Sequence, residues 1–462
     1  MTEDIICAIS TPPGMGAIAV IRLSGEGSGA LADRIFHSPS GQKLNDAPAN
    51  TIHFGRIMMD DEVLDEVLIS VFRAPHSFTG EESVEVSCHG SVYIQQKIME
   101  LLLAHGARLA EAGEFTRRAF RNGKFDLSQA EAVADLIASS SRASHRVAMN
   151  QMRGGFARKL SDLRDKLLQF VSLIELELDF SEEDVEFANR EQLYLLTEEI
   201  EREIEKLVGS FRLGNAIKSG IPVAIIGETN AGKSTLLNLL LDEEKAIVSD
   251  IHGTTRDVIE DTMNIGGVTF RFIDTAGIRH TSDTIETMGI ERTFRKIEQA
   301  SIVLWVVDLT TPREKIESLA ESIVPKTREK QLILLFNKAD LIAEEEQADI
   351  AGILPEVEGD RLFISAKQHH NTARLQELLV KAAAIPAIGK EDVIVTNLRH
   401  YEALSNALEA ILRVKEGLEI GITHDFLSQD IRECMFHLGE ITGQISTDEI
   451  LGNIFSKFCI GK

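Results

Sequence analysis

The chain has 462 residues, of which 44% are hydrophobic and 26% charged, which is ordinary for globular proteins and sufficient for about three domains. The 73 acidic residues outnumber the 48 basic ones, and the formal net charge of -25 excludes an overall attraction for nucleic acid or anionic membranes, leaving RNA to a local basic patch or to a partner. The scattered cysteines, the acidic N-terminus and the lack of a run of ~18 apolar residues predict a soluble, cytoplasmic protein with reduced thiols and neither zinc nor a membrane span.

The N-terminal part of the chain alternates short apolar runs with turn residues, a pattern that is typical of an α+β domain. Strands are predicted over 17–23, 67–72 and 83–87, and a helix over 93–103. We assign residues 1–120 to this domain.

Helical spacing dominates the next part of the chain. Apolar residues recur with the helical period between Leu163 and Leu178, and a second, charged helix is predicted over 190–207. The C-terminal part is helical again. We therefore assign 121–215 and 386–462 to one all-α domain that is split by an inserted domain.

The inserted domain, residues 216–385, alternates apolar strands with helices. Nearly continuous apolar strands separated by helices predict a mostly parallel sheet that is covered on both faces. The predicted strands are 222–226, 268–273, 302–307, 332–336 and 362–364.

A phosphate-binding loop follows the first of these strands. Gly227–Ser234 matches G-x-x-x-x-G-K-[ST] and precedes a predicted helix over 235–241. Lys233 is expected to reach the β and γ phosphates, and the Ser234 hydroxyl to ligate Mg²⁺. The nucleotide contacts expected in this loop are Asn230, Ala231, Gly232, Lys233, Ser234 and Thr235.

Three further motifs lie at later strand ends, where ligands bind in such sheets. In N-K-x-D, Asp340 can accept two hydrogen bonds from guanine, which adenine cannot supply, while Asn337 fixes the base edge and the stem of Lys338 covers the ring. The motifs therefore select GTP over ATP. Their residues are Asp274, Thr275, Ala276 and Gly277 of D-x-x-G, Asn337, Lys338 and Asp340 of N-K-x-D, and Ser365, Ala366 and Lys367 of S-A-K.

The four motifs in this order resemble those of the Ras-like GTPase superfamily. The resemblance implies a switch loop between the first two motifs, with Thr255 completing the magnesium shell that Ser234 begins. The nucleotide contacts expected in that loop are Ser249, Asp250, Ile251, His252, Gly253, Thr254 and Thr255.

Hydrolysis needs a group that orients the attacking water, and the usual glutamine after D-x-x-G is replaced by Ile278. Either hydrolysis is very slow, or another group takes over this task, for which nearby acids are candidates. Asp283 and Glu286 are both near enough in sequence, and the residues alone do not choose between them. Asn230 either offers K⁺ a neutral oxygen or caps its own loop.

Motifs outside the inserted domain narrow the resemblance. Thr11–Gly14, Ser77–Glu81, Gly113–Phe115 and the terminal Cys459–Lys462 are similar to those of the MnmE (TrmE) family of tRNA wobble-uridine modification GTPases. The implied fold has a folate-binding-like α+β domain, a split helical domain and a Ras-like G domain. From chemistry alone, Cys459 is either an activated thiolate or a small buried apolar side chain; the resemblance makes it a candidate functional thiol.

The resemblance also implies cofactors and partners. Family members form homodimers through the N-terminal domain and work with an FAD-containing partner, MnmG (GidA), in a heterotetramer or larger assembly. Together they add an aminomethyl or carboxymethylaminomethyl group to carbon 5 of the tRNA wobble uridine. The one-carbon donor is 5-formyl-tetrahydrofolate or a methylene form, and GTP hydrolysis depends on K⁺.

Site residues follow from the resemblance position by position. The catalytic residues are Glu286, rather than Asp283, together with Lys233 and Cys459. The potassium ligands are Asn230, Ser249, Ile251 and Thr254, and the folate contacts are Arg22, Glu85, Lys124 and Lys462. Two alternative functions are a regulatory switch of the ribosome-assembly type and a folate-binding module whose GTPase domain reports occupancy.

Overall fold

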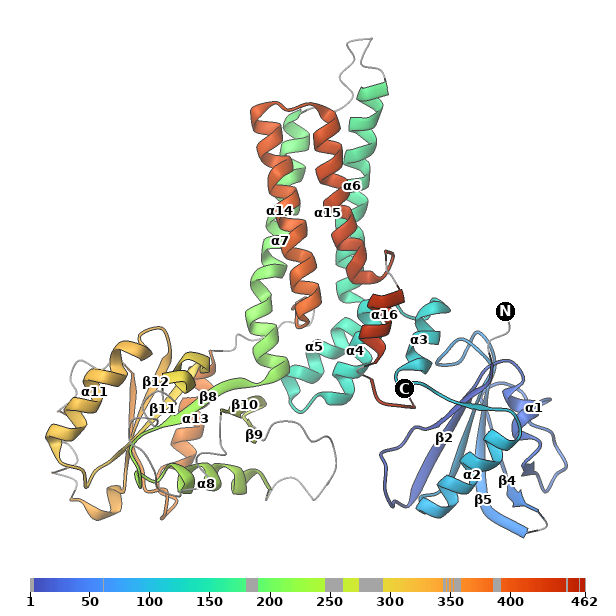
Figure 1. Cartoon of the computed structure of the whole chain (residues 1–462), viewed down its shortest axis with the longest axis horizontal. Helices are drawn as coiled ribbons and strands as arrows, with labels where there is room; N and C mark the ends of the chain where they lie inside the picture. Colours follow the sequence, from blue (N-terminus) through green and yellow to red (C-terminus); the bar gives the residue numbers. More distant parts are fainter. Residues whose placement is uncertain are drawn as a thin grey trace. The chain divides into compact units, whose positions relative to one another are not determined.

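The computed structural model divides the chain into two compact units (Figure 1). Unit 1 comprises Met1–Ile137, Met149–Ile204 and Ala403–Lys462, and unit 2 comprises Ala138–Ala148 and Glu205–Glu402. The residues that the structure describes are 4–60, 62–179, 190–245, 261–273, 294–343, 346, 349, 352, 359–384, 392–445, 448–456 and 458–461.

An antiparallel sheet with strand order β3-β4-β5-β6-β2-β1-β7 organises the N-terminal part of unit 1, and only β1 and β7 pair in parallel. The predicted strands 17–23, 67–72 and 83–87 and the predicted helix 93–103 are confirmed. The second and third of these strands are longer in the structure, and the first is shifted by one residue. The strands are β1 (Ile6–Ile9), β2 (Ile18–Ser24), β3 (Phe36–His37), β4 (Thr51–Met59), β5 (Glu62–Phe72), β6 (Ser83–His89) and β7 (Arg108–Leu109). The helices are α1 (Ser28–Ala32), α2 (Val92–Ala104) and α3 (Glu114–Arg121).

The two faces of this sheet bury different side chains, as strand alternation requires. One face packs against α1 and α2 through a core that includes Ile21, Val86 and Leu102. On the other face, Ile6 of β1 packs with Phe115 of α3. Helix α3 is thereby fixed over β1, beside the strands that carry Arg22 and Glu85.

Long helices form the rest of unit 1, and parts of α5, α7 and α14 belong to unit 2. Helices α6, α7, α14 and α15 run side by side in Figure 1, and the apolar residues predicted from Leu163 to Ile174 are buried between them. The second predicted helix extends well beyond residue 207. The helices are α4 (Leu127–Ala138), α5 (Arg142–Met152), α6 (Gly155–Asp179), α7 (Arg190–Ser219), α14 (Leu398–Ile420), α15 (His424–Thr442) and α16 (Asp448–Phe455).

The sheet of unit 2 has strand order β13-β12-β11-β8-β10-β9, parallel except for the pair β9 and β10. Helices α8 and α13 cover one face and α11 the other, each over a separate apolar core. This confirms the predicted Ras-like α/β domain. Its elements are β8 (Ile221–Ile226), α8 (Lys233–Lys245), β9 (Asp261–Ile265), β10 (Val268–Phe272), β11 (Ile302–Asp308), α11 (Arg313–Thr327), β12 (Gln331–Asn337), η1 (Ala339–Leu341), β13 (Asp360–Phe363) and α13 (Thr372–Ala383).

Across the described residues, no helix combines the length and the apolar character that crossing a bilayer requires.

Candidate nucleotide-binding site

The loop between β8 and α8 has the backbone that a phosphate-binding loop needs. Gly227 has φ 142° and Gly232 φ 95°, and a Cβ added to Gly227 would lie 2.2 Å from the carbonyl oxygen of Val306. Only glycine fits such positions without strain. Asn230 also adopts the left-handed region, with φ 64°. The loop therefore leads directly into the N-terminus of α8, whose free amides favour an anion.

Lys233, the first residue of α8, points back into this loop. Its Nζ donates to the carbonyl oxygens of Gly227, at 2.8 Å, and of Glu228. Burial, followed by repulsion from Lys296, lowers the pKa of Lys233, while Glu228 opposes the shift. A partly desolvated ammonium held by carbonyl oxygens is suited to exchange them for the charged oxygens of a phosphate.

One buried side chain joins three of the predicted motifs. Asn337, at the end of β12, is 3% exposed; its Nδ2 donates to the carbonyl oxygen of Ala231 at 2.7 Å, and its Oδ1 accepts from the amide of Ala366 at 3.0 Å. A Cβ added to Gly232 would lie 2.1 Å from Asn337 Nδ2. The phosphate loop, N-K-x-D and S-A-K are thus held together around Asn337.

The lysine of N-K-x-D is also held in place. Lys338 has φ 66°, and its Nζ forms an ion pair with Asp308 Oδ2 at 2.5 Å. Asp308 is the last residue of β11 and also accepts hydrogen bonds from the amide and hydroxyl of Thr310. Burial raises the pKa of Asp308, but the hydrogen bonds from Lys338 and Thr310 outweigh it and lower the pKa. Asp308 was not predicted from the sequence, although an acid that ends a continuous apolar strand was a usable signal.

The remaining described motif residues lie around the same edge of the sheet. Asp340 is exposed in the turn η1, so its carboxylate is accessible to a base. Ser365 is buried and its Oγ accepts from the amide of Gln368 at 3.2 Å, whereas Lys367 is exposed. Ser234 and Thr235 lie in the first turn of α8. These positions fit a guanine nucleotide whose magnesium ion is bound near Ser234.

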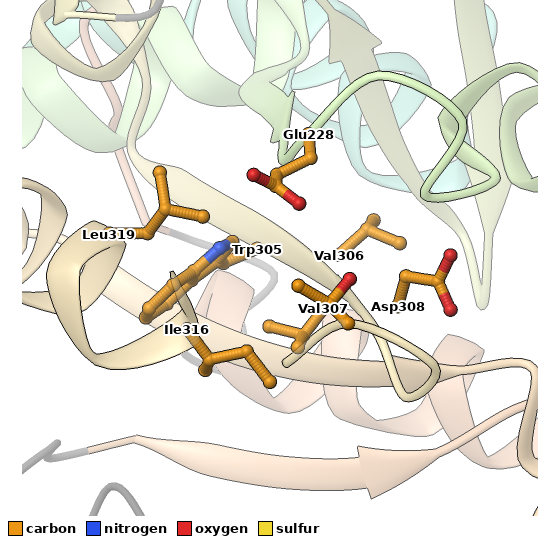
Figure 2. Close-up of a pocket in the computed structure, with 8 residues that line it drawn as sticks. Glu228, Trp305, Val306, Val307, Asp308, Ile316 and Leu319 are labelled. Atoms are coloured by element: carbon orange, nitrogen blue, oxygen red, sulfur yellow. The ribbon is translucent and has the colours of Figure 1, made fainter. Parts of the chain in front are cut away.

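A small pocket lies beside the phosphate loop (Figure 2). Its lining includes Glu228, Trp305, Asp308 and Ile316, from the loop, β11 and α11. Glu228 forms an ion pair with Lys315 of α11, with Oε1 2.8 Å from Nζ. This contact fixes the start of the phosphate loop against α11.

Several predicted residues lie outside the described residues. They are the switch-loop residues Ser249, Asp250, Ile251, His252, Gly253, Thr254 and Thr255, the D-x-x-G residues Asp274, Thr275, Ala276 and Gly277, the acids Asp283 and Glu286, and the terminal Lys462. Ile278 also lies there.

The predicted folate contacts lie in unit 1. Arg22 of β2 and Glu85 of β6 are register partners, and Arg22 Nε lies 2.8 Å from Glu85 Oε1. The guanidinium of Arg22 also lies over the rings of Phe78, at 5.1 Å, and Phe115, at 5.7 Å. Lys124 is exposed and donates to the carbonyl oxygen of Pro75 at 3.0 Å. The structure therefore pairs Arg22 with Glu85 and places Lys124 on a separate turn.

The C-terminal tail lies against the N-terminal sheet. Ile460 forms an antiparallel bridge with Ala112, and the hydroxyl of Ser10 donates to the carbonyl oxygen of Gly461 at 3.2 Å. Gly461 has φ 98°, and an added Cβ would lie 2.4 Å from the carbonyl oxygen of Ile9. Cys459 is exposed, so the alternative of a buried apolar side chain is wrong.

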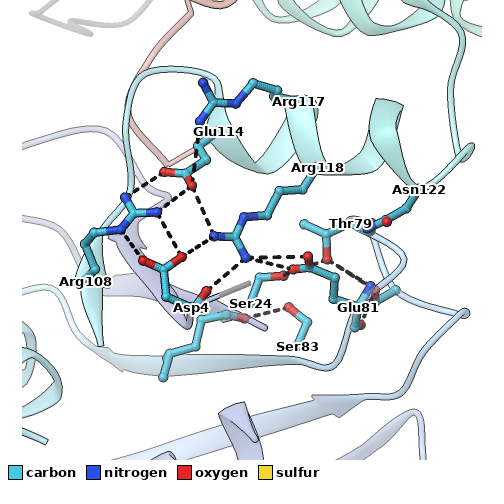
Figure 3. A network of polar contacts seen from close by, with 12 residues as sticks. Asp4, Ser24, Thr79, Glu81, Ser83, Arg108, Glu114, Arg117, Arg118 and Asn122 are labelled. Carbon is cyan, nitrogen blue, oxygen red and sulfur yellow. Dashed lines mark hydrogen bonds and ion pairs between the residues drawn. The ribbon is translucent and has the colours of Figure 1, made fainter. Parts of the chain in front are cut away.

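An ionic network around the buried pair Arg118 and Glu114 fixes the helix next to this tail (Figure 3). Arg118 of α3 contacts Glu114 at 3.1 Å, Asp4 at 3.1 Å and Glu81 at 3.3 Å, and Arg108 contacts Glu114 at 2.7 Å. Burial raises the pKa of Glu114, but hydrogen bonds from Arg108, from a backbone amide and from Arg118 lower it to about 2. The sequence analysis missed this network because charges on a short helix usually face solvent.

Two family models match the chain: the MnmE helical domain over residues 127–459, and the GTP-binding protein TrmE N-terminus over residues 5–124. The chain is similar to proteins named tRNA modification GTPase MnmE. That of Bacteroides thetaiotaomicron is 60% identical over 466 residues, covering 100% of both chains. That of Parabacteroides distasonis is 57% identical over 460 residues, covering 99% of both.

Solved structures match over a smaller part. A crystal structure of Era with MgGDPNP and a segment of 16S ribosomal RNA is 29% identical, covers 41% of this chain and 66% of its own, and has a TM-score of 0.27. The G domain of the T. maritima FeoB iron transporter is 23% identical, covers 35% and 98%, and has a TM-score of 0.25. The full-length identity and the two family models, together with the motifs around Asn337, show that the chain belongs to the MnmE (TrmE) family of tRNA modification GTPases.

Proposed function

We propose that this chain is a K⁺-dependent GTPase that works with an FAD-containing partner of the MnmG (GidA) type. Together they add an aminomethyl or carboxymethylaminomethyl group to carbon 5 of the wobble uridine of certain tRNAs. The carbon comes from a tetrahydrofolate. The observation that carries the GTPase part is the joining of three nucleotide-binding loops by Asn337, with Asp340 exposed beside it.

Different residues of unit 2 bind the base, the phosphates and the metal ion in this proposal. Asp340 selects guanine by accepting its two donors, and Asp308 keeps the Lys338 stem beside the base. Lys233 exchanges carbonyl partners for phosphate oxygens, and Ser234 ligates Mg²⁺. When bound, Mg²⁺ and K⁺ neutralise the negative charge that develops on the phosphates.

Hydrolysis in this proposal depends on residues taken from the family resemblance. Glu286 orients the attacking water in place of the missing glutamine. The potassium ligands are Asn230, Ser249, Ile251 and Thr254. The neutral amide oxygen of Asn230 supports its part in this set, because such an oxygen suits K⁺.

The tetrahydrofolate contacts are assigned to Arg22, Glu85, Lys124 and Lys462, and Cys459 is the candidate thiol. The planar Arg22 guanidinium, stacked on Phe78 and paired with Glu85, supports this assignment, because aromatic and charged groups together suit a pterin and its glutamate tail. We further propose a homodimer formed through the N-terminal domain, with domains at 1–120, 121–215, 216–385 and 386–462.

Nucleoside analysis of tRNA tests the modification part. In cells that lack this protein, the wobble uridines should lose their carbon-5 side chain, and the wild-type gene should restore it. A Lys233→Ala gene should fail to restore it, because its product binds phosphates poorly. Fully modified wobble uridines in the deletion strain would contradict the modification proposal and leave a regulatory GTPase switch as the function.

A further inference from the structure

A basic stretch interrupts this acidic chain in the helical part. Residues 136–161 contain five Arg and Lys residues and neither Asp nor Glu, although the whole chain carries a net charge of -25. The stretch covers the end of α4, helix α5 and the start of α6 (Figure 1). A local excess of positive charge on this scale is of the kind that attracts a polyanion to one part of an acidic chain.

The basic side chains of α5 share one face. Arg142, His145, Arg146 and Arg153 are exposed, whereas Val147 on the opposite side is buried. The spacings of three, four and eleven residues place the basic side chains along a single stripe. The amide of Arg153 still donates to the carbonyl oxygen of Met149 at 3.1 Å, so Arg153 continues the helical path just beyond the helix. The stripe is about 16 Å long at the usual helical rise.

The stripe is not explained by the folding of the helix. Across the described ranges, no carboxylate lies within ion-pair distance of Arg142, Arg146 or Arg153. Like charges four residues apart destabilise a helix, and basic residues in its first turn are unfavourable next to the positive end of the dipole. A row of unpaired arginines with these costs is expected where an external anion compensates them.

We propose that the exposed stripe of Arg142, Arg146 and Arg153 binds the phosphate backbone of tRNA. The planar guanidinium donates to two phosphate oxygens at once, and arginine is the only strongly basic residue type in the stripe. The length of the stripe matches a run of successive phosphates rather than a single anion. This inference rests on the proposed function, which makes tRNA the polyanion that the chain meets, and it deepens it by naming the surface that holds the tRNA.

Salt dependence of tRNA binding tests the stripe. The variant R142Q/R146Q/R153Q is compared with the full-length wild type and with the control R313Q/R328Q/R374Q, which removes the same charge from exposed positions in the G domain. Binding of a fluorescent tRNA transcript is followed by anisotropy between 50 and 200 mM KCl. Loss of three phosphate contacts, at about 0.7 to 0.9 each, should reduce the slope of log K against log salt by about 2.1 to 2.7. Wild-type affinity should therefore fall about 20- to 40-fold more over this range than that of the stripe variant.

GTP turnover without tRNA should be equal in all three proteins, because none of the substituted residues belongs to the nucleotide-binding motifs. Equal slopes for the stripe variant and the wild type would overturn the proposal, as would a wild type that binds no tRNA at 50 mM KCl. A stripe variant that keeps its tRNA slope but loses association with an acidic protein partner would also overturn it, since the stripe would then bind protein.

Nucleoside analysis distinguishes a failure of the stripe assignment from a failure of the proposed function. If the wild-type gene restores modified wobble uridines while the slopes are equal, the stripe assignment fails and the proposed function stands. If deletion leaves the wobble uridines unchanged while the stripe variant loses its salt dependence, the stripe is a phosphate-binding surface and the modification proposal fails.

Discussion

Asn337→Ala should lower the free energy of unfolding of unit 2 by more than the loss of an exposed amide side chain would. The side chain is 3% exposed and satisfies both the carbonyl oxygen of Ala231 and the amide of Ala366. Each buried backbone group left without a partner costs about 1–3 kcal/mol, so the expected loss is about 2–6 kcal/mol in the free energy of unfolding of unit 2. Nucleotide affinity should fall as well, because two loops lose their common support.

Trp305 makes this measurable, since it is the single tryptophan of the chain and lies buried in β11 of unit 2. Urea unfolding followed by Trp305 fluorescence reports the stability of that unit, and a fluorescent GDP analogue reports affinity. The matched control is Asn215→Ala, an exposed asparagine of α7 in the same unit, which should change stability by less than about 0.5 kcal/mol. If Asn337→Ala unfolds and binds nucleotide like the control, the bridging role is wrong.

The other predictions concern specificity, hydrolysis and acid stability. Asp340→Asn should shift preference from guanine to xanthine nucleotides in competition binding; unchanged GTP affinity would remove the assigned role. GTP turnover should be much faster in KCl than in NaCl, and equal rates would contradict the potassium mechanism. Glu286→Ala should slow hydrolysis about 100-fold at unchanged affinity; the same loss in Asp283→Ala alone would reverse the assignment. Glu114 has its folded-state pKa lowered from 4.5 to about 2, so its contribution of about 3 kcal/mol is complete above pH 4.5 and is lost toward pH 2. The free energy of unfolding of unit 1 in urea should therefore fall less from pH 5 to pH 3 in Glu114→Gln than in the wild type.

The strands of unit 2 were predictable because their burial on both faces leaves continuous apolar runs. Strand β9 was missed, since Asp261–Ile265 lies at the antiparallel edge and alternates polar with apolar residues. In the N-terminal sheet the same reasoning predicted β2, β5 and β6 but missed β1, β3, β4 and β7. Of these, the two-residue strands β3 and β7 are too short to carry a period.

The site was predictable where it depends on motif residues and unpredictable where it depends on distant backbone. The motif places Asn337 beside the base, but its hydrogen bonds go to Ala231 and Ala366, whose side chains carry no signal. The network of Arg118 and Glu114 was not predicted from the sequence, for a related reason. Its members come from the chain start, β7, α3 and the loop before β6, and each looks like an ordinary surface charge until the fold brings them together.

The bridge through Asn337 has a consequence for nucleotide exchange. The phosphate loop and the base-binding loops would otherwise be independent, and a nucleotide could release its base and its phosphates separately. Because one amide side chain bonds to Ala231 on the phosphate side and to Ala366 on the base side, a shift of either loop strains a hydrogen bond of the other. Gly232 packs tightly against Asn337. Its φ is 95°, and an added Cβ would lie 2.1 Å from Asn337 Nδ2, so the loop and this side chain cannot move closer together. If Asp340 binds guanine as proposed, Asn337 links the base-binding loops directly to the phosphate loop.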